Sequence, residues 1–322
     1  YNEPWQRQLL RVSVDGEATA LSDANGYAIG TAAGRYAIVA QQSAETHEVG
    51  YQLLRDGARV HQIESLAMPL PVTPKPQISA RTDAGLATAL LWPTGHLPGS
   101  HRLPVVVSIY GGPHHSRVVA AARTFASDQW LADQGFCVVV IDNRGTPGRG
   151  PAWERAVAGN LADPVLEDQV AALQEVLTNY AADTDASRVG ITGWSFGGYL
   201  SALAVLARPD VYQAAWAGAP VTDWSLYDTA YTERYLGMPQ ANAAAYANSS
   251  LLHRAAGLRG ELAIVHGLAD DNVLAANSLQ LSGALLAAGR PHRFLPLAGV
   301  SHMTPQVDVK RNLLLLMRDF FQ

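Results

Sequence analysis

Residues 193–199 read Gly-Trp-Ser-Phe-Gly-Gly-Tyr, and this stretch decides the fold of the chain. The spacing Gly-x-Ser-x-Gly, with Ser195 at its centre, is that of a nucleophile elbow, a strained turn that exposes a serine hydroxyl between a strand and a helix. Glycines suit the flanking positions because the close approach of helix and strand leaves no room for a Cβ. The neighbouring residues agree, since 188–192 are rich in strand formers and 199–207 in helix formers. The stretch therefore predicts a nucleophilic serine at a strand–helix junction.

The composition limits the classes of protein to consider. The chain has 322 residues, of which 48% are apolar and 16% charged, as expected for one or two globular domains. The net charge of −5 and the lack of a basic stripe argue against a nucleic-acid partner, and no apolar run is long enough to span a membrane. Cys137 is the single cysteine, which excludes an internal disulfide. Because the chain begins at Tyr1, we expect it to be part of a longer product, and the compartment, periplasmic or cytoplasmic, stays open.

The first seventy residues differ in pattern from the rest. Short alternating runs at 8–14, 36–40 and 51–54 are separated by Asp-Gly turns, which is typical of a β-meander. A few strands alone make a poor domain, so we interpret residues 1–70 as the end of a β-propeller. The proline-rich segment 68–76 is predicted to be an extended linker.

Residues 71–322 are predicted to form an α/β domain. Apolar strand patterns occur at 104–110, 136–142, 188–192, 213–217, 261–266 and 292–297, and helical patterns at 164–179, 196–207, 275–288 and 305–320. Buried strands that alternate with helices indicate a mainly parallel sheet with helices on both faces. Ligands of such sheets bind beyond the carboxyl ends of the strands. That rule brings Tyr110, Ser195 and the residues after His266 to one edge.

A serine hydroxyl needs a base within hydrogen-bond reach, and the base needs an acid to orient it. On this fold the chain order is serine, acid, histidine. Four histidines follow Ser195, namely His253, His266, His292 and His302. His302 lies in a loop just past the last predicted strand, where a base would reach the serine, and we predict it as the base. His266 and His292 lie at strand ends and are interpreted as packing or edge residues, and His253 has no distinguishing context.

Two aspartates compete for the role of the acid. Asp270 and Asp271 lie in the loop after the strand predicted at 261–266. Asp270 follows Ser195 by 75 residues and precedes His302 by 32, which suits the required order. The alternative for both aspartates is to cap the following helix. Physical reasoning from the residues leaves the choice between them open.

A tetrahedral intermediate also needs hydrogen-bond donors. One is the backbone N–H of Phe196, the residue after the nucleophile. The other is the hydroxyl of Tyr110, at the end of a strand and directly before two glycines, although a tyrosine there can also simply cap the strand end. His114 and His115 lack the partner spacing of a zinc site, and no phosphate-binding loop is present. We therefore expect neither a metal nor a cofactor.

Four motifs together resemble the prolyl oligopeptidase family. They are residues 193–199, Tyr110-Gly-Gly-Pro113, Tyr231-Thr-Glu-Arg-Tyr-Leu-Gly237 and His266-Gly-Leu-Ala-Asp-Asp-Asn-Val273, and Asp142-Asn-Arg-Gly145 is similar as well. Within the family they look like the dipeptidyl peptidase IV branch, including its bacterial members. The resemblance covers roughly residues 77–322 and implies an α/β-hydrolase fold, with residues 1–70 as the end of the family's propeller.

The resemblance also implies roles for individual residues. Ser195 would be the nucleophile, Asp270 the acid and His302 the base, with the Tyr110 hydroxyl as an oxyanion donor. Asn272 would bind a carbonyl group of the substrate. The pocket for proline would consist of Val221, Trp224, Tyr227, Tyr231 and Val273. An apolar pocket suits a pyrrolidine ring, which has no N–H to satisfy. The spacing of the three aromatic residues also fits the core-facing side of a helix.

The activity implied by the resemblance is that of a serine peptidase that forms an acyl-enzyme on Ser195 and releases N-terminal dipeptides after proline or alanine. Its partners would be peptide substrates and, through the hydrolase domain, a second copy of the chain. Two departures matter. Phe196 replaces a tyrosine that is frequent in this branch, and residues 1–70 cannot supply the propeller glutamates that clamp a substrate's N-terminus. The alternatives are an acylaminoacyl peptidase or esterase, which the motifs at 231–235 and 270–273 argue against, and a catalytically impaired fragment.

Overall fold

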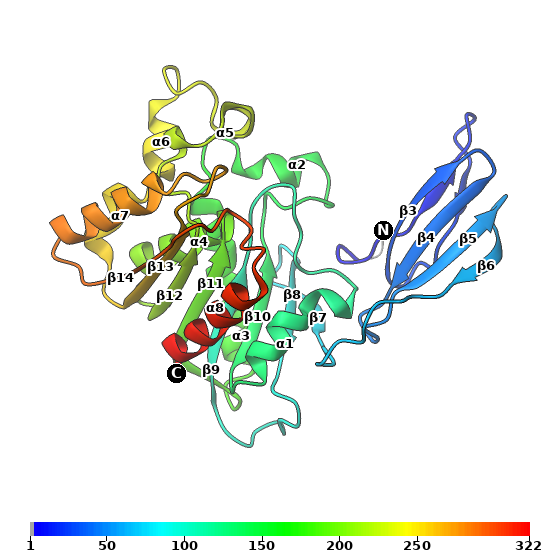
Figure 1. The fold of residues 1–322 in the computed structure, drawn as a ribbon, viewed down its shortest axis with the longest axis horizontal. Coiled ribbons are helices and arrows are strands. Elements are labelled where there is room, and N and C mark those ends of the chain that lie inside the picture. The colour runs from blue at the N-terminus through cyan, green and yellow to red at the C-terminus, as the bar shows by residue number, and fades with distance from the viewer. Residues whose placement is uncertain (1–2) are drawn as a thin grey trace.

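The computed structural model of the chain describes residues 3–322 and contains an eight-stranded sheet (Figure 1). Its strand order is β14-β13-β12-β11-β9-β10-β8-β7. The strands are β7 (Gln77–Arg81), β8 (Leu86–Leu91), β9 (Leu103–Ile109), β10 (Cys137–Asp142), β11 (Thr184–Trp194), β12 (Ala214–Gly218), β13 (Glu261–Gly267) and β14 (Arg293–Leu297). Neighbours from β14 to β10 are parallel, whereas β8 and β7 are added antiparallel. The predicted mostly parallel α/β-hydrolase sheet is confirmed.

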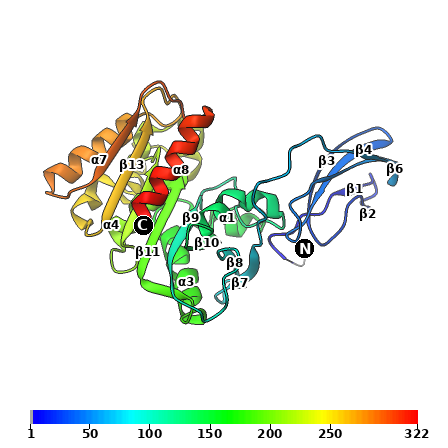
Figure 2. The same ribbon diagram turned by 60° about the horizontal axis from the view of Figure 1, so that its bottom comes forward.

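Helices cover both faces of this sheet. One face carries α3 (Asp163–Asn179), α4 (Phe196–Ala207) and α7 (Ala276–Ala287), and the other carries α1 (Ala126–Ala132) and α8 (Val307–Phe321), as Figure 2 shows. Successive side chains of a strand point to opposite faces, which explains why the central strands are apolar throughout. The α/β architecture predicted from those apolar runs is confirmed.

Shorter helices lie outside these two layers. They are α2 (Pro151–Glu154), α5 (Thr229–Leu236) and α6 (Ala243–Ser249). The last two belong to the long connection between β12 and β13 and lie at the top of the molecule in Figure 1. The carboxyl ends of the parallel strands meet at one edge of the sheet, and the candidate site is built there.

The N-terminal strands form two small antiparallel sheets. The strands β1 (Leu10–Val12) and β2 (Ala18–Ala20) pair with each other, and β3 (Tyr27–Ala33), β4 (Tyr36–Gln42), β5 (Gly50–Arg55) and β6 (Ala58–Ile63) pair in chain order. The predicted meander that resembles the end of a propeller is therefore confirmed. These sheets lie to one side of the eight-stranded sheet (Figure 1), and the segment before β1 is joined to the loop after β9 by a backbone bond from Ala120 N to Trp5 O. The division into residues 1–70 and 71–322 stays a prediction.

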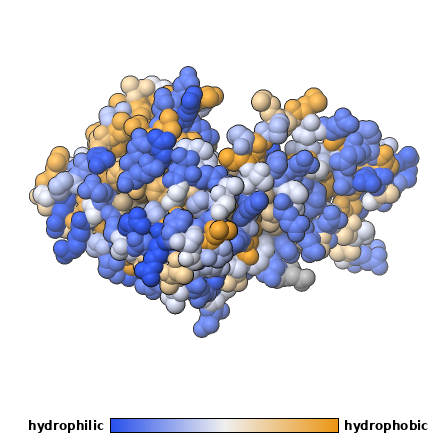
Figure 3. All heavy atoms as spheres, turned by 90° about the horizontal axis from the view of Figure 1, so that it is seen from below, coloured by the Kyte–Doolittle hydropathy of each residue, from blue (hydrophilic) through white to orange (hydrophobic). Residues whose placement is uncertain are grey.

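The surface seen from below is mostly hydrophilic, with smaller hydrophobic areas spread over it (Figure 3). The large apolar clusters are internal and lie on either side of the sheet. Among residues 3–322, no helix combines the length and the apolar character needed to cross a bilayer.

Candidate active site

Ser195 lies between β11 and α4 in a strained backbone conformation. Its φ of 60° and ψ of −117° are unusual for a residue with a Cβ. The turn is held by a 2.9 Å hydrogen bond from Ser195 N to Gly218 O. A Cβ on Gly193 or Gly197 would lie 2.5 or 2.2 Å from the carbonyl oxygen of Ile109, so only glycine fits at these positions. The strand–elbow–helix arrangement predicted from the sequence is thus present.

Asp270 and His302 are in direct contact. The Nδ1 atom of His302 lies 2.7 Å from Oδ2 of Asp270, and the aspartate side chain is fully buried. The other carboxylate oxygen accepts the N–H groups of Asn272 and Val273, at 3.0 and 2.9 Å. Asp271 is exposed to solvent. Of the two aspartates that the sequence left open, the structure therefore brings Asp270 to His302.

The segments that carry Ser195 and His302 also touch each other. Trp194, directly before the serine, donates its indole N–H to the carbonyl oxygen of His302 at 2.8 Å. This bond holds the histidine loop, between β14 and α8, against the elbow. The three predicted residues Ser195, Asp270 and His302 therefore gather at the carboxyl edge of the sheet, on β11, β13 and β14 or the loops that follow them.

His266 contacts the loop that carries Asp270. The sequence analysis did not predict this contact. It is fully buried, and its Nε2 atom lies 2.8 Å from the carbonyl oxygen of Val273 and 3.4 Å from Oδ2 of Asp270. A carbonyl can only accept, so Nε2 carries the proton and Nδ1 accepts from the Ser278 hydroxyl at 2.6 Å. Burial lowers the pKa of His266, which keeps the ring neutral. Its position four residues before Asp270, at the end of the strand that leads into the loop of Asp270, was the available signal.

Tyr110 directly follows β9 and lies beside the elbow. Its ring is 6.2 Å from that of Phe196 and meets His115 edge-on at 5.1 Å. Burial raises the pKa of the Tyr110 hydroxyl, with smaller contributions from Tyr227 and Tyr235, so the phenol keeps its proton at neutral pH and can donate it in a hydrogen bond. Phe196 is the first residue of α4, so its N–H has no partner within the helix. Two groups able to donate a hydrogen bond therefore belong to residues at the elbow or packed against it.

The aromatic residues predicted for a substrate pocket form one cluster. Trp224 and Tyr231 stack 6.0 Å apart, Tyr227 meets both rings edge-on, and Phe196 lies 5.5 Å from Trp224. Val221 and Val273 are buried in the large apolar core that also contains Trp224. The Tyr227 hydroxyl donates to Oδ1 of Asn272 at 3.1 Å. The structure thus brings Trp224, Tyr227, Tyr231 and Asn272 into contact, and it buries Val221 and Val273 in the same large core as Trp224.

The spacing of the three aromatic residues does not come from one helix. Trp224–Leu226 is a single 3₁₀ turn, Tyr227 is extended, and α5 begins only at Thr229. The alternative of one continuous helix face, which the spacing allowed, is therefore excluded. The helical conformation is interrupted between the 3₁₀ turn and α5. The rings of Trp224, Tyr227 and Tyr231 nevertheless contact one another, because the turn and α5 each pack against the cluster.

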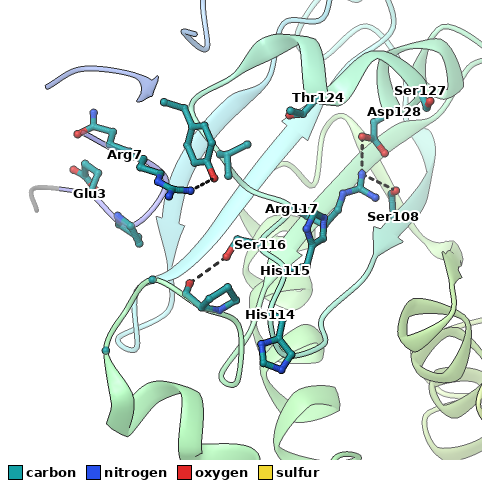
Figure 4. A pocket seen from close by; sticks show the side chains of 17 residues that line it. Glu3, Arg7, Ser108, His114, His115, Ser116, Arg117, Thr124, Ser127 and Asp128 are labelled. Atoms are coloured by element: carbon teal, nitrogen blue, oxygen red, sulfur yellow. Dashed lines mark hydrogen bonds and ion pairs between the residues drawn. The ribbon is translucent and has the colours of Figure 1, made fainter. Parts of the chain in front are cut away.

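A cavity of about 980 Å³ lies where the N-terminal segment meets the loop after Tyr110 (Figure 4). It is lined from one side by Glu3, Arg7 and Tyr27, and from the other by residues His114–Arg117 and the start of α1. His114 hydrogen-bonds the Tyr235 hydroxyl and belongs to the edge of the aromatic cluster.

In residues 3–322 no group of three His, Cys, Asp or Glu side chains is arranged to hold a metal ion.

Asp142 is a buried carboxylate at the same edge, at the end of β10. Burial raises the pKa of its carboxyl to about 6, against the opposing effect of the N–H groups of Arg117 and Val118. The folded pKa thus lies above the unfolded value, so this group's contribution to stability is present at low pH and is lost as the pH rises through about 6.

We accordingly predict how the free energy of unfolding depends on this aspartate. From pH 4 to pH 7 the wild type should lose about 2 kcal/mol relative to Asp142→Asn, because about two pKa units separate the folded and unfolded carboxyl groups and the unfolded one is already partly ionised at pH 4. Urea unfolding of both proteins at a series of pH values measures the difference. Stability curves that run parallel across this interval would contradict the prediction.

The chain is similar in sequence and in structure to known peptidases. The model of the Prolyl oligopeptidase family matches residues 123–322. Mouse dipeptidyl peptidase 8 is 39% identical over 234 residues, which cover 70% of this chain and 26% of that protein. Mouse prolyl endopeptidase FAP is 32% identical over 222 residues, covering 67% and 28%. The crystal structure of Porphyromonas gingivalis dipeptidyl peptidase 4 superimposes with a TM-score of 0.91 at 28% identity, over 99% of this chain and 46% of the other. The chain thus spans about a quarter of the curated relatives' length.

Proposed function

Because the chain belongs to the prolyl oligopeptidase family, whose members are serine peptidases, we propose that it hydrolyses peptide bonds through an acyl-enzyme on Ser195 and releases N-terminal dipeptides after proline or alanine. The observation that carries the proposal is the 2.7 Å contact between Asp270 and His302 beside a serine held in a strained elbow. Strained backbone persists only where the surrounding structure enforces it, and it is concentrated at functional sites.

The proposed reaction assigns each group one task. His302 takes the proton of the Ser195 hydroxyl as it attacks the scissile carbonyl, while Asp270 holds the imidazole with its proton on Nδ1. The negative charge that develops on the carbonyl oxygen is stabilised by the Phe196 N–H and the Tyr110 hydroxyl. His302 then gives its proton to the leaving amine, and a water molecule, activated in the same way, releases the acyl group from Ser195.

The proposed pocket for the residue before the scissile bond is the aromatic cluster. A proline ring is apolar and rigid and brings no N–H that would need a partner, so walls made by Trp224, Tyr227 and Tyr231 suit it. The amide of Asn272, placed by the Tyr227 hydroxyl, would bind a substrate carbonyl. Alanine fits the same space with fewer contacts. Phe196 contributes an apolar ring without a hydroxyl to this cluster, 5.5 Å from the ring of Trp224.

The release of dipeptides, as opposed to internal cleavage, is the finer part of the proposal. The relatives include proteins named dipeptidyl peptidase and one named prolyl endopeptidase, and the chain matches only part of each. The alternatives remain an acylaminoacyl peptidase or esterase, and a fragment whose activity is impaired. We also propose that residues 71–322 are the catalytic unit, with residues 1–70 as propeller strands, and that two copies associate through that unit.

A substrate comparison tests this function. The chain should be labelled by a fluorophosphonate and should cleave Ala-Pro-p-nitroanilide and Gly-Pro-p-nitroanilide faster than their N-acetylated forms. Faster cleavage of the acetylated substrates would overturn the dipeptidyl assignment and favour the acylaminoacyl alternative. Absence of both labelling and turnover in the folded protein would overturn the peptidase proposal.

A further inference from the structure

The motif Asp142-Asn-Arg-Gly145 has no task in the proposed reaction, yet its first two residues lie beside the oxyanion side of the site. Asp142 is the last residue of β10, which runs parallel to β9, the strand that ends next to Tyr110. Parallel neighbours end at the same edge of the sheet. Asp142 and Asn143 are 5% and 0% exposed. Polar side chains buried this deeply are kept only where each has partners.

Asp142 holds the far end of the loop that follows Tyr110. Its Oδ1 accepts the N–H of Arg117 at 2.9 Å, and its Oδ2 accepts the N–H of Val118 at 2.8 Å. Two acceptor oxygens on one side chain are needed for this pair of bonds, and an ionised carboxylate provides them. The end of the loop at residues 117–118 is therefore fixed to β10.

Asn143 holds the near end of the same loop. Its Nδ2 donates to the carbonyl oxygen of Gly111 at 2.9 Å, and its Oδ1 accepts from Nε2 of Gln169 on α3, also at 2.9 Å. The glutamine bond orients the amide so that its N–H points to the loop. Gly111 has a φ of +68°, and a Cβ there would lie 2.7 Å from Oδ1 of Asn143. The asparagine and the glycine thus approach each other closely.

The side chain of Arg117 fixes the loop a third time. Its guanidinium donates to Asp128 of α1 at 2.7 Å and to the hydroxyl of Ser108 at 3.4 Å, and Figure 4 shows it pointing toward both. Ser108 belongs to β9 and precedes Tyr110 by two residues. The loop is therefore attached to the strand that leads into Tyr110 as well as to the strand next to it.

The opposite side of the loop packs against the elbow. A Cβ on Gly112 would lie 2.6 Å from the ring of Phe196, and one on Gly197 would lie 3.2 Å from Cα of Tyr110. The Tyr110 segment is consequently confined between the end of β10 and the nucleophile turn. A shift of the loop on the β10 side moves Tyr110 relative to Ser195, because neither neighbour leaves free space.

We propose that Asp142 and Asn143 are positioning residues that clamp the loop Gly111–Val118 from both ends and so set the place of the Tyr110 hydroxyl opposite Ser195. The inference rests on the proposed function, in which that hydroxyl stabilises the oxyanion. An ionised aspartate in a fully buried place is costly, and an asparagine has only one acceptor oxygen for the two loop N–H groups. The carboxylate is retained because it alone satisfies both.

The test is a double-mutant cycle on Ala-Pro-p-nitroanilide hydrolysis. Asp142→Asn should lower kcat by about 10- to 100-fold with KM nearly unchanged, because misplacing a catalytic group by about 1 Å costs on this order while the aromatic pocket is untouched. Tyr110→Phe should lower kcat by about 100- to 1,000-fold. The double variant should be no slower than Tyr110→Phe alone, because Asp142 acts through the hydroxyl that is already gone. Multiplied effects would show a general structural defect and overturn the proposal.

Asp168→Asn is the matched control. Asp168 is also buried, at 7% exposure. It accepts hydrogen bonds from the backbone N–H of Arg144 at 2.8 Å and from the side-chain Nε of Arg144 at 2.9 Å, and these bonds do not involve the loop Gly111–Val118. This variant should keep kcat within about twofold, whatever it does to stability. An equal loss of kcat in both variants would contradict a specific role of Asp142.

Backbone amide hydrogen exchange provides a readout that does not need turnover. Asp142→Asn and Asn143→Ala should both increase exchange in the peptide that contains residues 111–118, and Asp168→Asn should not. Unchanged exchange in that peptide would overturn the clamp. Wild-type protein that does not hydrolyse the substrate but shows this exchange pattern would contradict the proposed function and leave the clamp supported, so the two failures are distinguishable.

Discussion

Replacing Ser195 by alanine is expected to lower turnover of Ala-Pro-p-nitroanilide by about a millionfold, to the rate that binding and the oxyanion donors sustain without a nucleophile. His302→Ala should cost about as much, and the double variant no more, because the two residues act as one unit. Steady-state kinetics on purified variants, with burst titration of active sites to exclude trace wild type, measure these losses.

Ser201→Ala is the matched control for this experiment. Ser201 lies in α4, six residues after the nucleophile, and its buried hydroxyl donates to the carbonyl oxygen of Gly197 at 2.7 Å. Its loss removes a local helix contact and leaves the elbow glycines in place, so kcat should stay within a few-fold of wild type. If Ser195→Ala retained more than about one per cent of turnover, another group would be the nucleophile and the proposed mechanism would be wrong.

The second large effect separates the two neighbouring aspartates. Asp270→Asn should lower kcat by about 10,000-fold, because an amide does not hold His302 with its proton on Nδ1 or stabilise the imidazolium that forms. The Oδ1 atom of the new asparagine can still accept the N–H groups of Asn272 and Val273, so the loop should keep its shape. Asp271→Asn changes an exposed side chain and should alter kcat by less than about twofold.

This pair of variants serves as its own control, since the two substitutions are chemically identical and one residue apart. Circular dichroism and the urea midpoint should be similar for both, which would assign any loss of turnover to the active site. The reverse order of effects would mean that Asp271 is the acid and that the observed contact of Asp270 with His302 is not the catalytic one.

Most of the regular structure followed from the sequence, and the exceptions have physical causes. The runs at 104–110, 136–142 and 261–266 match β9, β10 and β13 to within a residue at each end, because central parallel strands are apolar on both faces. The antiparallel strands β7 and β8 were missed. Leu86–Leu91 is short, apolar and fully buried, so no periodicity distinguishes a strand from a helix there. The short helices α5 and α6 depend on packing over the site more than on their own patterns.

The residues of the site also fall into those that the sequence predicted and those that it did not. The motifs predicted which residue types gather at the edge of the sheet, and the structure shows direct contacts for part of this set, such as Asp270 with His302 and Tyr227 with Asn272. The role of His266 and the contacts of Asp142 and Asn143 were not predicted, because their signal is burial and a partner far away in the chain. A histidine at a strand end has the same local pattern whether it packs against apolar side chains or, as here, lies 3.4 Å from Asp270.

The sequence by itself determined the elbow at Ser195, since a Cβ on Gly193 would lie 2.5 Å from the backbone of Gly197, four residues further along the same turn. Only the tertiary structure decided that Asp270 and not Asp271 contacts His302, and that Asp142 and Asn143 hold the loop after Tyr110. Partners separated by some 30 residues meet only after the strands between them have packed in register. Which of two adjacent side chains faces inward is then set by the turn they share.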